Sequence, residues 1–264
     1  MLLVDSHCHL DRLLYCDELP SLEAALKQAS QRGVGLFLSV GVTLDGFAEM
    51  IKLVEPYPSV HASCGVHPLS IADGVDMAQL REYAAHPKVV AIGETGLDYY
   101  YAQNQAEQQQ AFAGQIELAA ELAKPLIIHS RDANADTIAL LKAHGGEKAG
   151  GVIHCFTGDQ AMAEQALELG FYISFSGIIS FNSAQALRDV AASIPLERLL
   201  VETDSPYLAP VPYRGQSNRP AYTRVVAEKL AELKGIGLEE LAEITTNNYL
   251  KLFSIRDPQP FVVD

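Results

Sequence analysis

Residues 2–40 read LLVDSHCHLDRLLYCDELPSLEAALKQASQRGVGLFLSV, and the fold prediction begins from this stretch. It opens with the apolar run Leu2–Asp5, continues through the helix-favouring segment Ser21–Arg32, and ends in a second apolar run, Val34–Val40. Ala, Leu, Gln and Lys favour a helix, whereas runs of β-branched and other apolar residues favour strands. A strand, a helix and a second strand in this order predict a parallel βαβ unit.

The same alternation continues along the chain. The further predicted strands are Val60–Cys64, Val89–Ile92, Leu126–Ile128, Val152–Ile153, Phe171–Phe175 and Leu199–Val201. Helix-favouring segments between them include Ala106–Ala123, Ala133–His144, Ala161–Leu169 and Ala184–Ala192. Eight such βα units in 264 residues predict an α/β fold of the closed (β/α)8 TIM-barrel type rather than an open doubly wound sheet.

The C-terminal part predicts additions to this barrel. Tyr222–Leu233 and Leu238–Phe253 predict two extra C-terminal helices, and Asp257–Asp264 predicts a loose tail with two prolines. Because the sequence shows neither a linker nor a repeat, residues 1–264 are predicted to form a single domain. No GxGxxG or GxxxxGK[ST] turn follows the first strand, which argues against dinucleotide-binding and P-loop proteins.

Composition excludes several classes. With 48% hydrophobic residues and 20% charged residues, the chain is predicted to be globular rather than disordered. A net charge of −14 argues against a protein that coats nucleic acid or anionic membranes. The four cysteines form no CxxC pair, so they predict reduced thiols in a cytoplasmic protein. Met1–Leu10 lacks the basic region of a signal peptide, so no secretion signal is predicted. The most apolar stretch, Val34–Val42, is too short to span a bilayer. The sequence indicates no obligatory protein partner.

Polar side chains lie where the predicted strands end. Asp5, His7 and His9 alternate along the first strand, so they share one face. Further candidate ligands at the ends of later strands are Glu94, His129, His154 and Asp204. Because a barrel gathers the C-terminal ends of its strands at one mouth, we expect these side chains to converge.

This set is too large for one tetrahedral ion and suits two divalent ions bridged by a carboxylate. The sequence therefore predicts a dinuclear hydrolase. A single histidine at a strand end is more often structural, but the conjunction on five strands favours a metal centre. Imidazoles favour Zn, Mn, Co or Ni, with Mg as the alternative. Cys8, Cys64 and Cys155 are interpreted as small apolar residues, and Tyr99–Tyr101 as either pocket wall or loop packing.

These residues resemble the TatD family of metal-dependent deoxyribonucleases in the amidohydrolase superfamily. The resemblance covers essentially the whole chain and rests on six motifs in order: VDSHCHLD (4–11), GVHP (65–68), GETGLDY (93–99), PLIIHSR (125–131), HCFTG (154–158) and LLVETDSP (199–206). It implies one ion held by His7, His9 and Asp204, a second held by His129 and His154, and Glu94 as the bridge. The implied activity is hydrolysis of phosphodiester bonds in DNA, in some members 3′ to 5′ from single-stranded ends.

Catalytic and substrate-binding roles follow from the chemistry and the resemblance together. Asp204 is predicted to orient the attacking water and take its proton, and Asp204 or His67 to return a proton to the leaving oxygen. Glu202 and Asp5 are predicted to fix ligands or position substrate, with a buried salt bridge as the alternative for both. The predicted substrate-binding residues are His67, Arg131, Arg214 and Asn218, of which the last two belong to a loop, RGQSNRP (214–220), that also resembles a family element.

Three hypotheses remain open. The favoured one is a nuclease that binds a DNA end or a short nucleic acid, because two divalent ions would offset the acidic charge locally. The second keeps the site but changes the substrate to a small phosphoester, an amide or ester, or an aminoacyl linkage. The third is a binding or scaffold protein with structural metals, which the lack of a cysteine-rich ligand set disfavours.

Overall fold

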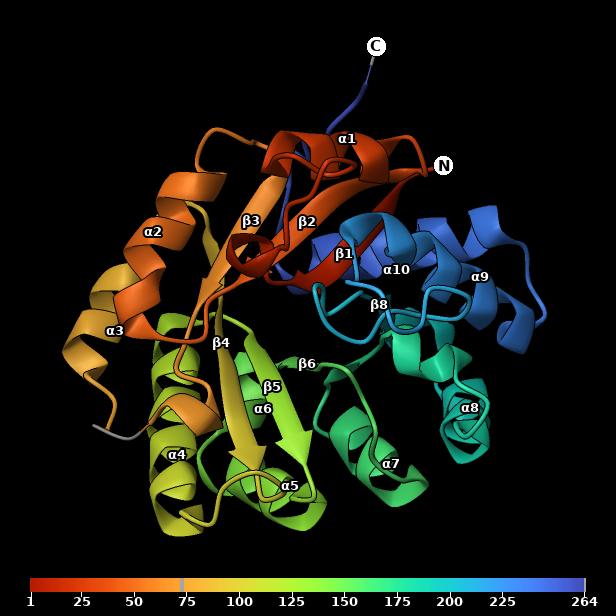
Figure 1. Ribbon diagram of the computed structural model, residues 1–264. Helices are drawn as coiled ribbons and strands as arrows, with labels where there is room; N and C mark the ends of the chain where they lie inside the picture. Colours follow the sequence, from red (N-terminus) through yellow and green to blue (C-terminus); the bar gives the residue numbers. More distant parts are fainter. Residues whose placement is uncertain (72–73, 264) are drawn as a thin grey trace.

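The computed structural model describes residues 1–71 and 74–263. In these residues, eight parallel strands form one sheet in the order of the sequence, β1 to β8, with helices on the outside (Figure 1). The strands are β1 (Leu3–Cys8), β2 (Val34–Val40), β3 (Val60–Cys64), β4 (Val89–Asp98), β5 (Leu126–Arg131), β6 (Gly151–Ile153), β7 (Tyr172–Phe175) and β8 (Leu199–Val201). The predicted TIM-barrel fold is confirmed.

The connections between strands are helical. The helices are α1 (Leu22–Ser30), α2 (Leu44–Val54), α3 (Met77–Ala84), α4 (Gln105–Leu122), α5 (Asn134–Ala143), α6 (Gly146–Ala149), α7 (Gln160–Glu168), α8 (Gln185–Ser193), α9 (Thr223–Lys234) and α10 (Leu238–Leu252). Helix α4 buries Phe112, Ile116 and Ala119, the stripe that its sequence predicts. Helices α2 and α3 fill two connections for which no helix bounds were predicted.

Strands β1 and β4 extend further than their apolar runs predict. The first was expected to end at Asp5 and the fourth at Ile92, but they continue to Cys8 and Asp98. The backbone of β4 stays paired with β5 as far as Asp98 and Arg131, although polar side chains project from it. Hydropathy therefore underestimates the length of these strands, because their last residues alternate between the polar site, which Glu94 and Asp98 face, and the outer apolar cluster, which includes Cys8 and Leu97.

Alternate side chains of the strands enter two apolar layers. Val4, Leu36, Ile127 and Leu200 belong to a cluster inside the barrel. Their neighbours in sequence, such as Leu3 and Phe37, belong to a larger cluster between the sheet and the helices. Strands buried on both faces in this way explain the nearly continuous apolar runs.

The barrel is nearly closed, and its seam lies between β8 and β1. The described residues form no strand ladder there. Instead, the N–H of Asp204 donates to the carbonyl of His7 (2.9 Å), and the N–H of His9 donates to the carbonyl of Ser205 (2.8 Å). The Ser6 hydroxyl donates to the Val201 carbonyl at 3.0 Å. These bonds join the mouth ends of the first and last strands.

Helix α10 covers the opposite end of the same seam. Asn248 donates to the carbonyl oxygens of Leu196 and Leu199, at 2.8 and 2.9 Å. Thr246 donates to the Leu2 carbonyl, and the buried Tyr249 packs into the inner apolar cluster. The predicted C-terminal helices are confirmed, and α10 is part of the barrel's packing, because it joins the starts of β1 and β8 at this end of the seam.

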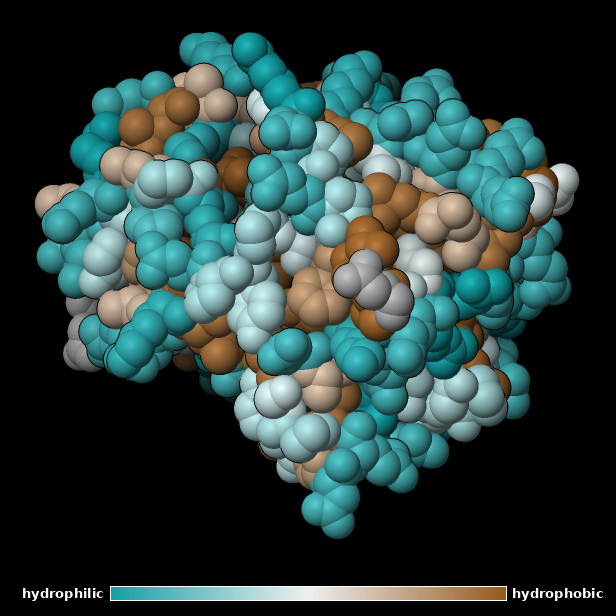
Figure 2. All heavy atoms as spheres, turned by 90° about the horizontal axis from the view of Figure 1, so that it is seen from above, coloured by the Kyte–Doolittle hydropathy of each residue, from teal (hydrophilic) through white to brown (hydrophobic). Residues whose placement is uncertain are grey.

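The C-terminal residues are not the loose tail that was predicted. The N–H of Phe261 donates to the Gly35 carbonyl at 2.8 Å, and its side chain packs against the outer core. The final residue of the predicted tail, Asp264, lies outside the described residues. Seen from above the view of Figure 1, the surface is mainly hydrophilic, with hydrophobic residues in separate patches (Figure 2). No helix among the described residues is both long enough and apolar enough to cross a membrane.

Candidate metal centre

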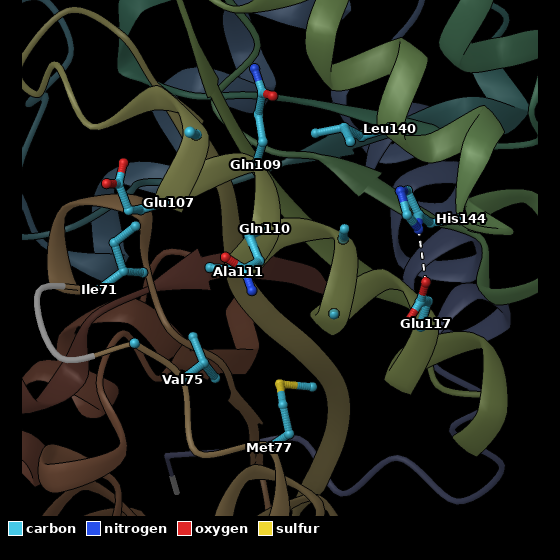
Figure 3. Close-up of a pocket in the computed structure, with 14 residues that line it drawn as sticks. Ile71, Val75, Met77, Glu107, Gln109, Gln110, Ala111, Glu117, Leu140 and His144 are labelled. Carbon is cyan, nitrogen blue, oxygen red and sulfur yellow. Dashed lines mark hydrogen bonds and ion pairs between the residues drawn. The ribbon is translucent and has the colours of Figure 1, made fainter.

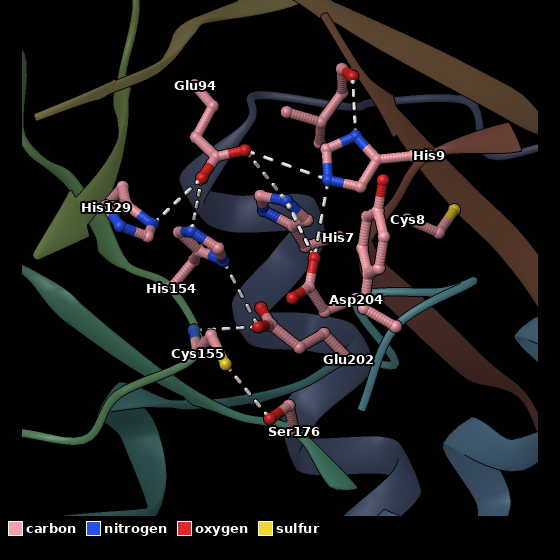
Figure 4. Close-up of polar contacts among 12 residues, drawn as sticks. His7, Cys8, His9, Glu94, His129, His154, Cys155, Ser176, Glu202 and Asp204 are labelled. Atoms are coloured by element: carbon pink, nitrogen blue, oxygen red, sulfur yellow. Dashed lines mark hydrogen bonds and ion pairs between the residues drawn. The ribbon is translucent and has the colours of Figure 1, made fainter. Parts of the chain in front are cut away.

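The predicted metal ligands converge at the C-terminal ends of the strands (Figure 4). The set comprises His7 on β1, Glu94 on β4, His129 on β5, and His9, His154 and Asp204 just beyond β1, β6 and β8. All are fully or largely buried except His129 and Asp204, which are partly exposed. The barrel therefore brings together residues that are up to about 200 positions apart in the sequence.

Glu94 lies at the centre of this cluster. Its Oε1 is 2.8 Å from His154 Nε2, 3.2 Å from His129 Nδ1 and 3.4 Å from His67 Nε2. Its Oε2 faces the other side, 3.5 Å from His7 Nε2 and 3.7 Å from His9 Nε2. One carboxylate thus faces two groups of imidazoles.

Asp204 completes the group on the His7 side. Its Oδ1 is 3.3 Å from His9 Nε2 and 3.7 Å from His7 Nε2. The other nitrogen of His9, Nδ1, lies 3.1 Å from the Val40 carbonyl, which suits an Nδ1–H donor and leaves Nε2 free as a ligand. Asp204 has φ of 57°, a left-handed conformation that is costly for this residue and typical of functional positions.

The spacing of these donors fits a metal ion. The four distances between His7 or His9 Nε2 and the oxygens of Glu94 and Asp204 are 3.3, 3.5, 3.7 and 3.7 Å. Two ligands about 2.1 Å from a tetrahedral ion are separated by about 3.4 Å. His7 is fully buried, yet neither ring nitrogen has a hydrogen-bond partner among the described residues. A buried unpaired nitrogen of this kind is expected where an ion binds.

Three ligand groups can be drawn in the cluster. They are His7, His9 and Asp204; His7, His154 and Glu202; and His67, Glu94 and His129. Only nitrogen and oxygen donors take part, which suits Zn, Mn, Co, Ni or Mg rather than a cysteine-rich structural site. His67, which was predicted to act on the substrate, therefore also lies within reach of an ion.

The charge distribution favours ionised carboxylates, but it divides the imidazoles. Burial opposes ionisation of Glu94, but the charges of His154 and His67 outweigh it and hold its pKa well below the usual value. Burial is likewise outweighed at Asp204, whose pKa is lowered by His9 and His7. Burial and the nearby His154 lower the pKa of His7. Burial opposes protonation of His9, His129 and His154, yet the carboxylates beside them outweigh it and raise their pKa values, so an ion bound by these three would displace their protons. Ionised carboxylates and a neutral imidazole are the forms that bind divalent ions.

Asp98 is a site residue for which no role was predicted. Its Oδ2 lies 3.1 Å from His129 Nε2, and its Oδ1 accepts the N–H groups of Tyr100 and Tyr101. This contact orients the His129 ring so that Nδ1 faces Glu94. Asp98 belongs to the GETGLDY motif (93–99), which could have marked it as a site residue. Because the strand was predicted to end at Ile92, the place of Asp98 on the inner face of β4 was not foreseen.

Glu202, predicted as catalytic, lies behind the ligands. It is fully buried, its Oε1 accepts the N–H of Cys155 at 2.7 Å, and the same oxygen is 3.4 Å from His154 Nδ1. Its Oε2 has no partner among the described residues. The geometry places Glu202 where it orients His154, or offers a further ligand, and not where substrate reaches it.

The side chain of Asp5 bonds to Thr203 and not to the ring nitrogens of His7, so any effect on this ligand passes through the backbone. Its two oxygens accept the N–H of Thr203 at 2.8 Å and the Thr203 hydroxyl at 2.6 Å. Burial raises the pKa of Asp5 to about 8. Asp5 thus joins β1 to the segment after β8, which carries Asp204.

The predicted substrate-binding residues divide into two groups. His67 and Arg131 are partly buried at the mouth, and Arg214 is exposed, with its guanidinium 3.7 Å from the Phe181 ring centre. Asn218 is fully buried, and its amide donates to the carbonyls of Thr203 and Tyr207. Asn218 therefore holds the loop after β8 and leaves no N–H for a substrate.

The tyrosine run after β4 is also divided. The hydroxyl of Tyr99 donates to Asp136 Oδ2 at 2.8 Å, so this residue packs against α5. Tyr100 and Tyr101 are exposed beside Arg131. Loop packing therefore describes Tyr99, whereas the pocket-wall interpretation stays a prediction for Tyr100 and Tyr101.

A groove of about 780 Å³ lies elsewhere, along α4 (Figure 3). It is lined mainly by small, apolar and amide side chains, and an ion pair between Glu117 and His144 lies at one end. None of its described lining residues belongs to the histidine and carboxylate cluster. Size alone therefore does not mark the chemical site, and the convergence of ligands does.

A parallel eight-stranded barrel with imidazoles and carboxylates at its mouth defines a class of metal-dependent hydrolases. The family model described as TatD related DNase matches residues 4–254, so the chain belongs to the TatD family. The Escherichia coli K12 metal-dependent hydrolase YcfH is 52% identical over 256 residues, which cover 97% of each chain.

Two further comparisons agree. The metal-dependent hydrolase YabD of Bacillus subtilis is 40% identical over 257 residues, 96% of this chain and 100% of the relative. The crystal structure of YjjV, a TatD homologue from Escherichia coli, superposes with a TM-score of 0.89 at 34% identity, covering 96% of this chain and 98% of that one. The chain is a metal-dependent hydrolase of the TatD family.

Proposed function

We propose that this hydrolase cleaves phosphodiester bonds at the ends of DNA, with two divalent ions held at the barrel mouth. The observation that carries the proposal is Glu94, whose Oε1 faces His154, His129 and His67 while its Oε2 faces His7 and His9, at 2.8 to 3.7 Å. A single tetrahedral ion cannot use all of these donors, whereas two ions sharing Glu94 can. The family model, described as TatD related DNase, supports DNA as the substrate class.

In this proposal, His7, His9 and Asp204 hold one ion, His129 and His154 hold the other, and Glu94 bridges them. Asp98 and Glu202 orient His129 and His154 through the contacts described above. The bound ions supply Lewis acidity toward phosphoryl oxygens and lower the pKa of water. Zn, Mn, Mg, Co and Ni all suit these donors.

Asp204 is the carboxylate that can exchange protons with a reacting water. Its side chain is 14% exposed, whereas those of Glu94 and Glu202 are 4% and 0% exposed. Its lowered pKa keeps it ionised near neutral pH, as a general base requires. The side chain of His67 is 15% exposed, and burial lowers its pKa, so it would meet the leaving oxygen as a neutral hydrogen-bond donor rather than as an imidazolium acid.

The protein carries a net charge of −14, which repels a negatively charged nucleic-acid substrate unless positive charge is concentrated at the site. Two bound ions add four positive charges at the mouth, and Arg131 stands at the end of β5 beside His129. This arrangement supports binding of a short nucleic-acid end rather than a long duplex track. The salt dependence of binding should therefore be shallow.

The test is a substrate panel with the metal-replete chain. Oligonucleotides labelled at either end are compared with bis(p-nitrophenyl) phosphate and with aminoacyl esters, in Zn, Mn, Mg, Co or Ni. We expect stepwise shortening of the oligonucleotides from one end, abolished by a chelator. The matched control replaces both His7 and His9 with Ala, which should remove bound metal and activity together.

Two results would count against the proposal. Turnover of the esters without cleavage of any oligonucleotide would move the substrate to the second class. Two ions per chain at wild-type affinity in the His7 and His9 double variant would remove this pair from the ligands.

A further inference from the structure

Exposed apolar side chains gather around the mouth of the barrel. Among the described residues, the large apolar side chains with substantial exposed surface, other than Met1 and Val262, all lie in loops that follow β1, β3, β4 or β8. Several are tyrosines, which combine an apolar ring with a polar tip. Exposed apolar side chains concentrated around a site indicate contact with a ligand.

Tyr207 contacts a candidate ligand directly, with its ring centre 5.9 Å from that of His9, whereas Tyr100 and Tyr101 form a pair of rings connected to His129 through Asp98. Their backbone N–H groups donate to Asp98 Oδ1 at 3.1 and 2.9 Å, while Asp98 Oδ2 lies 3.1 Å from His129 Nε2. A single buried carboxylate therefore positions both the loop and a ligand. The rings contact Arg131, which ends β5 two residues after His129.

The two rings are exposed but fixed. Tyr100 and Tyr101 are 60% and 64% exposed. Their ring centres are 4.8 Å apart and perpendicular. The Arg131 guanidinium lies 4.1 Å from the first ring centre and 4.6 Å from the second, within cation–π range. Holding two large rings in solvent costs hydrophobic free energy that a ligand would recover.

We propose that Tyr100 and Tyr101, backed by Arg131, form a platform on which an unpaired nucleobase stacks while the neighbouring phosphate enters the metal centre. The inference rests on the proposed function, because it names how that site receives a DNA end. Every base has a π face, so aromatic stacking accepts any sequence. Arg131 adds a positive charge where the backbone would pass.

The platform has a consequence for substrate structure. A base inside a duplex has both faces covered by its neighbours, whereas a base at a single-stranded or frayed end has a face to offer. The enzyme should therefore prefer single-stranded ends to blunt duplex ends. An end that carries a phosphate but lacks a base should be a poor ligand.

The test measures binding apart from turnover. Single-stranded oligonucleotides carry 2-aminopurine at the 3′ or the 5′ terminus, and matched oligonucleotides carry an abasic residue there. Each is titrated with the metal-replete Asp204→Asn protein, alone and combined with Tyr100→Ala, Tyr101→Ala or both. Fluorescence quenching reports stacking and anisotropy reports affinity.

We expect quenching at one terminus only, and about 5- to 100-fold weaker binding of that oligonucleotide in the double Ala variant. The abasic oligonucleotide should bind weakly and equally to all variants. Tyr100→Phe and Tyr101→Phe should retain both quenching and affinity. Because backbone N–H groups make the contacts with Asp98, the Ala variants should keep their metal content, measured in the same samples.

Equal affinity for base-containing and abasic ends in both Tyr and Ala proteins would overturn the platform. If the wild-type enzyme still shortens oligonucleotides in that case, the proposed function survives and only the stacking role is lost. If the wild-type enzyme neither binds nor cleaves any oligonucleotide, the proposed function and the stacking platform are both wrong, and the exposed tyrosines serve another ligand.

Discussion

At the scale of single residues, Asp204 combines a place among the ligands with access to solvent. Its Oδ1 lies 3.3 Å from His9 Nε2, and its side chain is the most exposed of the three carboxylates closest to the ions' expected position. Metal binding and proton transfer are therefore both within its reach. Substitution can separate the two roles, because an amide oxygen still faces an ion but does not take a proton.

The first prediction concerns Asp204→Asn. Turnover of a phosphodiester should fall by about 10²- to 10⁴-fold, the usual effect of losing an acid–base group, while metal content falls much less. The measurement is turnover between pH 5 and 9 with the bound metal counted in the same samples. A near wild-type rate with two ions bound would show that no protein base is needed at this position.

The second prediction concerns Glu94→Gln. Since Oε1 and Oε2 of Glu94 face different imidazole groups, the variant should hold the two ions less well as a pair. We expect the number of bound ions to drop from two toward one at limiting metal concentration. Metal analysis after gel filtration checks this, and unchanged stoichiometry with full turnover would exclude a bridging role.

At the scale of elements, the seam between β8 and β1 builds half of the candidate site. Asp204 and His7 are joined through the backbone, and Asp5 is joined to Thr203 through both oxygens. Loss of these contacts would let the strand that carries His7 and His9 move relative to Asp204. The seam therefore links barrel stability to metal affinity.

The third prediction tests this link with Thr203→Val. The substitution keeps the shape but removes the hydroxyl that donates to Asp5, so unfolding free energy should fall by about 1–3 kcal/mol. Metal affinity should weaken as well, because the segment that carries Asp204 loses a bond that fixes it to β1. Denaturant unfolding and metal titration measure the two effects.

The matched control for the seam is Thr95→Val. Thr95 is also fully buried, but its hydroxyl has no hydrogen-bond partner among the described residues. This substitution should leave stability unchanged or raise it. If Thr203→Val and Thr95→Val lower the free energy of unfolding equally, the loss comes from placing Val at a buried Thr position and not from the missing bond to Asp5.

At the scale of the whole molecule, helix α10 ties the chain's end to its first strands. Within this contact, His61 on β3 lies 3.0 Å, through Nδ1, from the hydroxyl of Tyr249 on α10. Burial, with a smaller effect from Lys88, lowers the pKa of His61 to about 4. The unfolded chain therefore binds a proton between about pH 6.5 and 4 that the folded chain excludes.

The fourth prediction is a pH dependence of stability. Because the pKa of His61 is lowered in the folded state, the free energy of unfolding should fall by up to about 3 kcal/mol as the pH drops from 6.5 to about 4. His61→Asn should flatten the wild-type curve over this range. Denaturant unfolding at matched metal loading measures both. Tyr249→Phe leaves His61 buried, so it should lower stability without changing how steeply stability depends on pH. If wild type and His61→Asn show the same pH dependence, His61 is not its source.

The sequence by itself determined the barrel and the convergence of the candidate ligands at its mouth. Periodic apolar runs and helix-favouring segments placed the start of every strand and the helices α1, α4, α5 and α7 to α10 within a few residues, because local burial and propensity carry that information; the end of β4 lies six residues beyond its apolar run. Strand alternation put His7 and His9 on one face, and the fold rule placed later ligands at the same mouth.

Only the tertiary structure decided which polar residues support the ligands and which hold the scaffold. Asp98, Asp5, Glu202 and Asn218 are all polar residues, but the partners that define their roles lie between 15 and 198 residues away in the sequence. The closure of the seam by side chains, and the docking of Phe261 on β2, also depend on contacts between distant segments. Local patterns set where strands and helices form, whereas the partner of a buried polar group is fixed only when the strands are brought together.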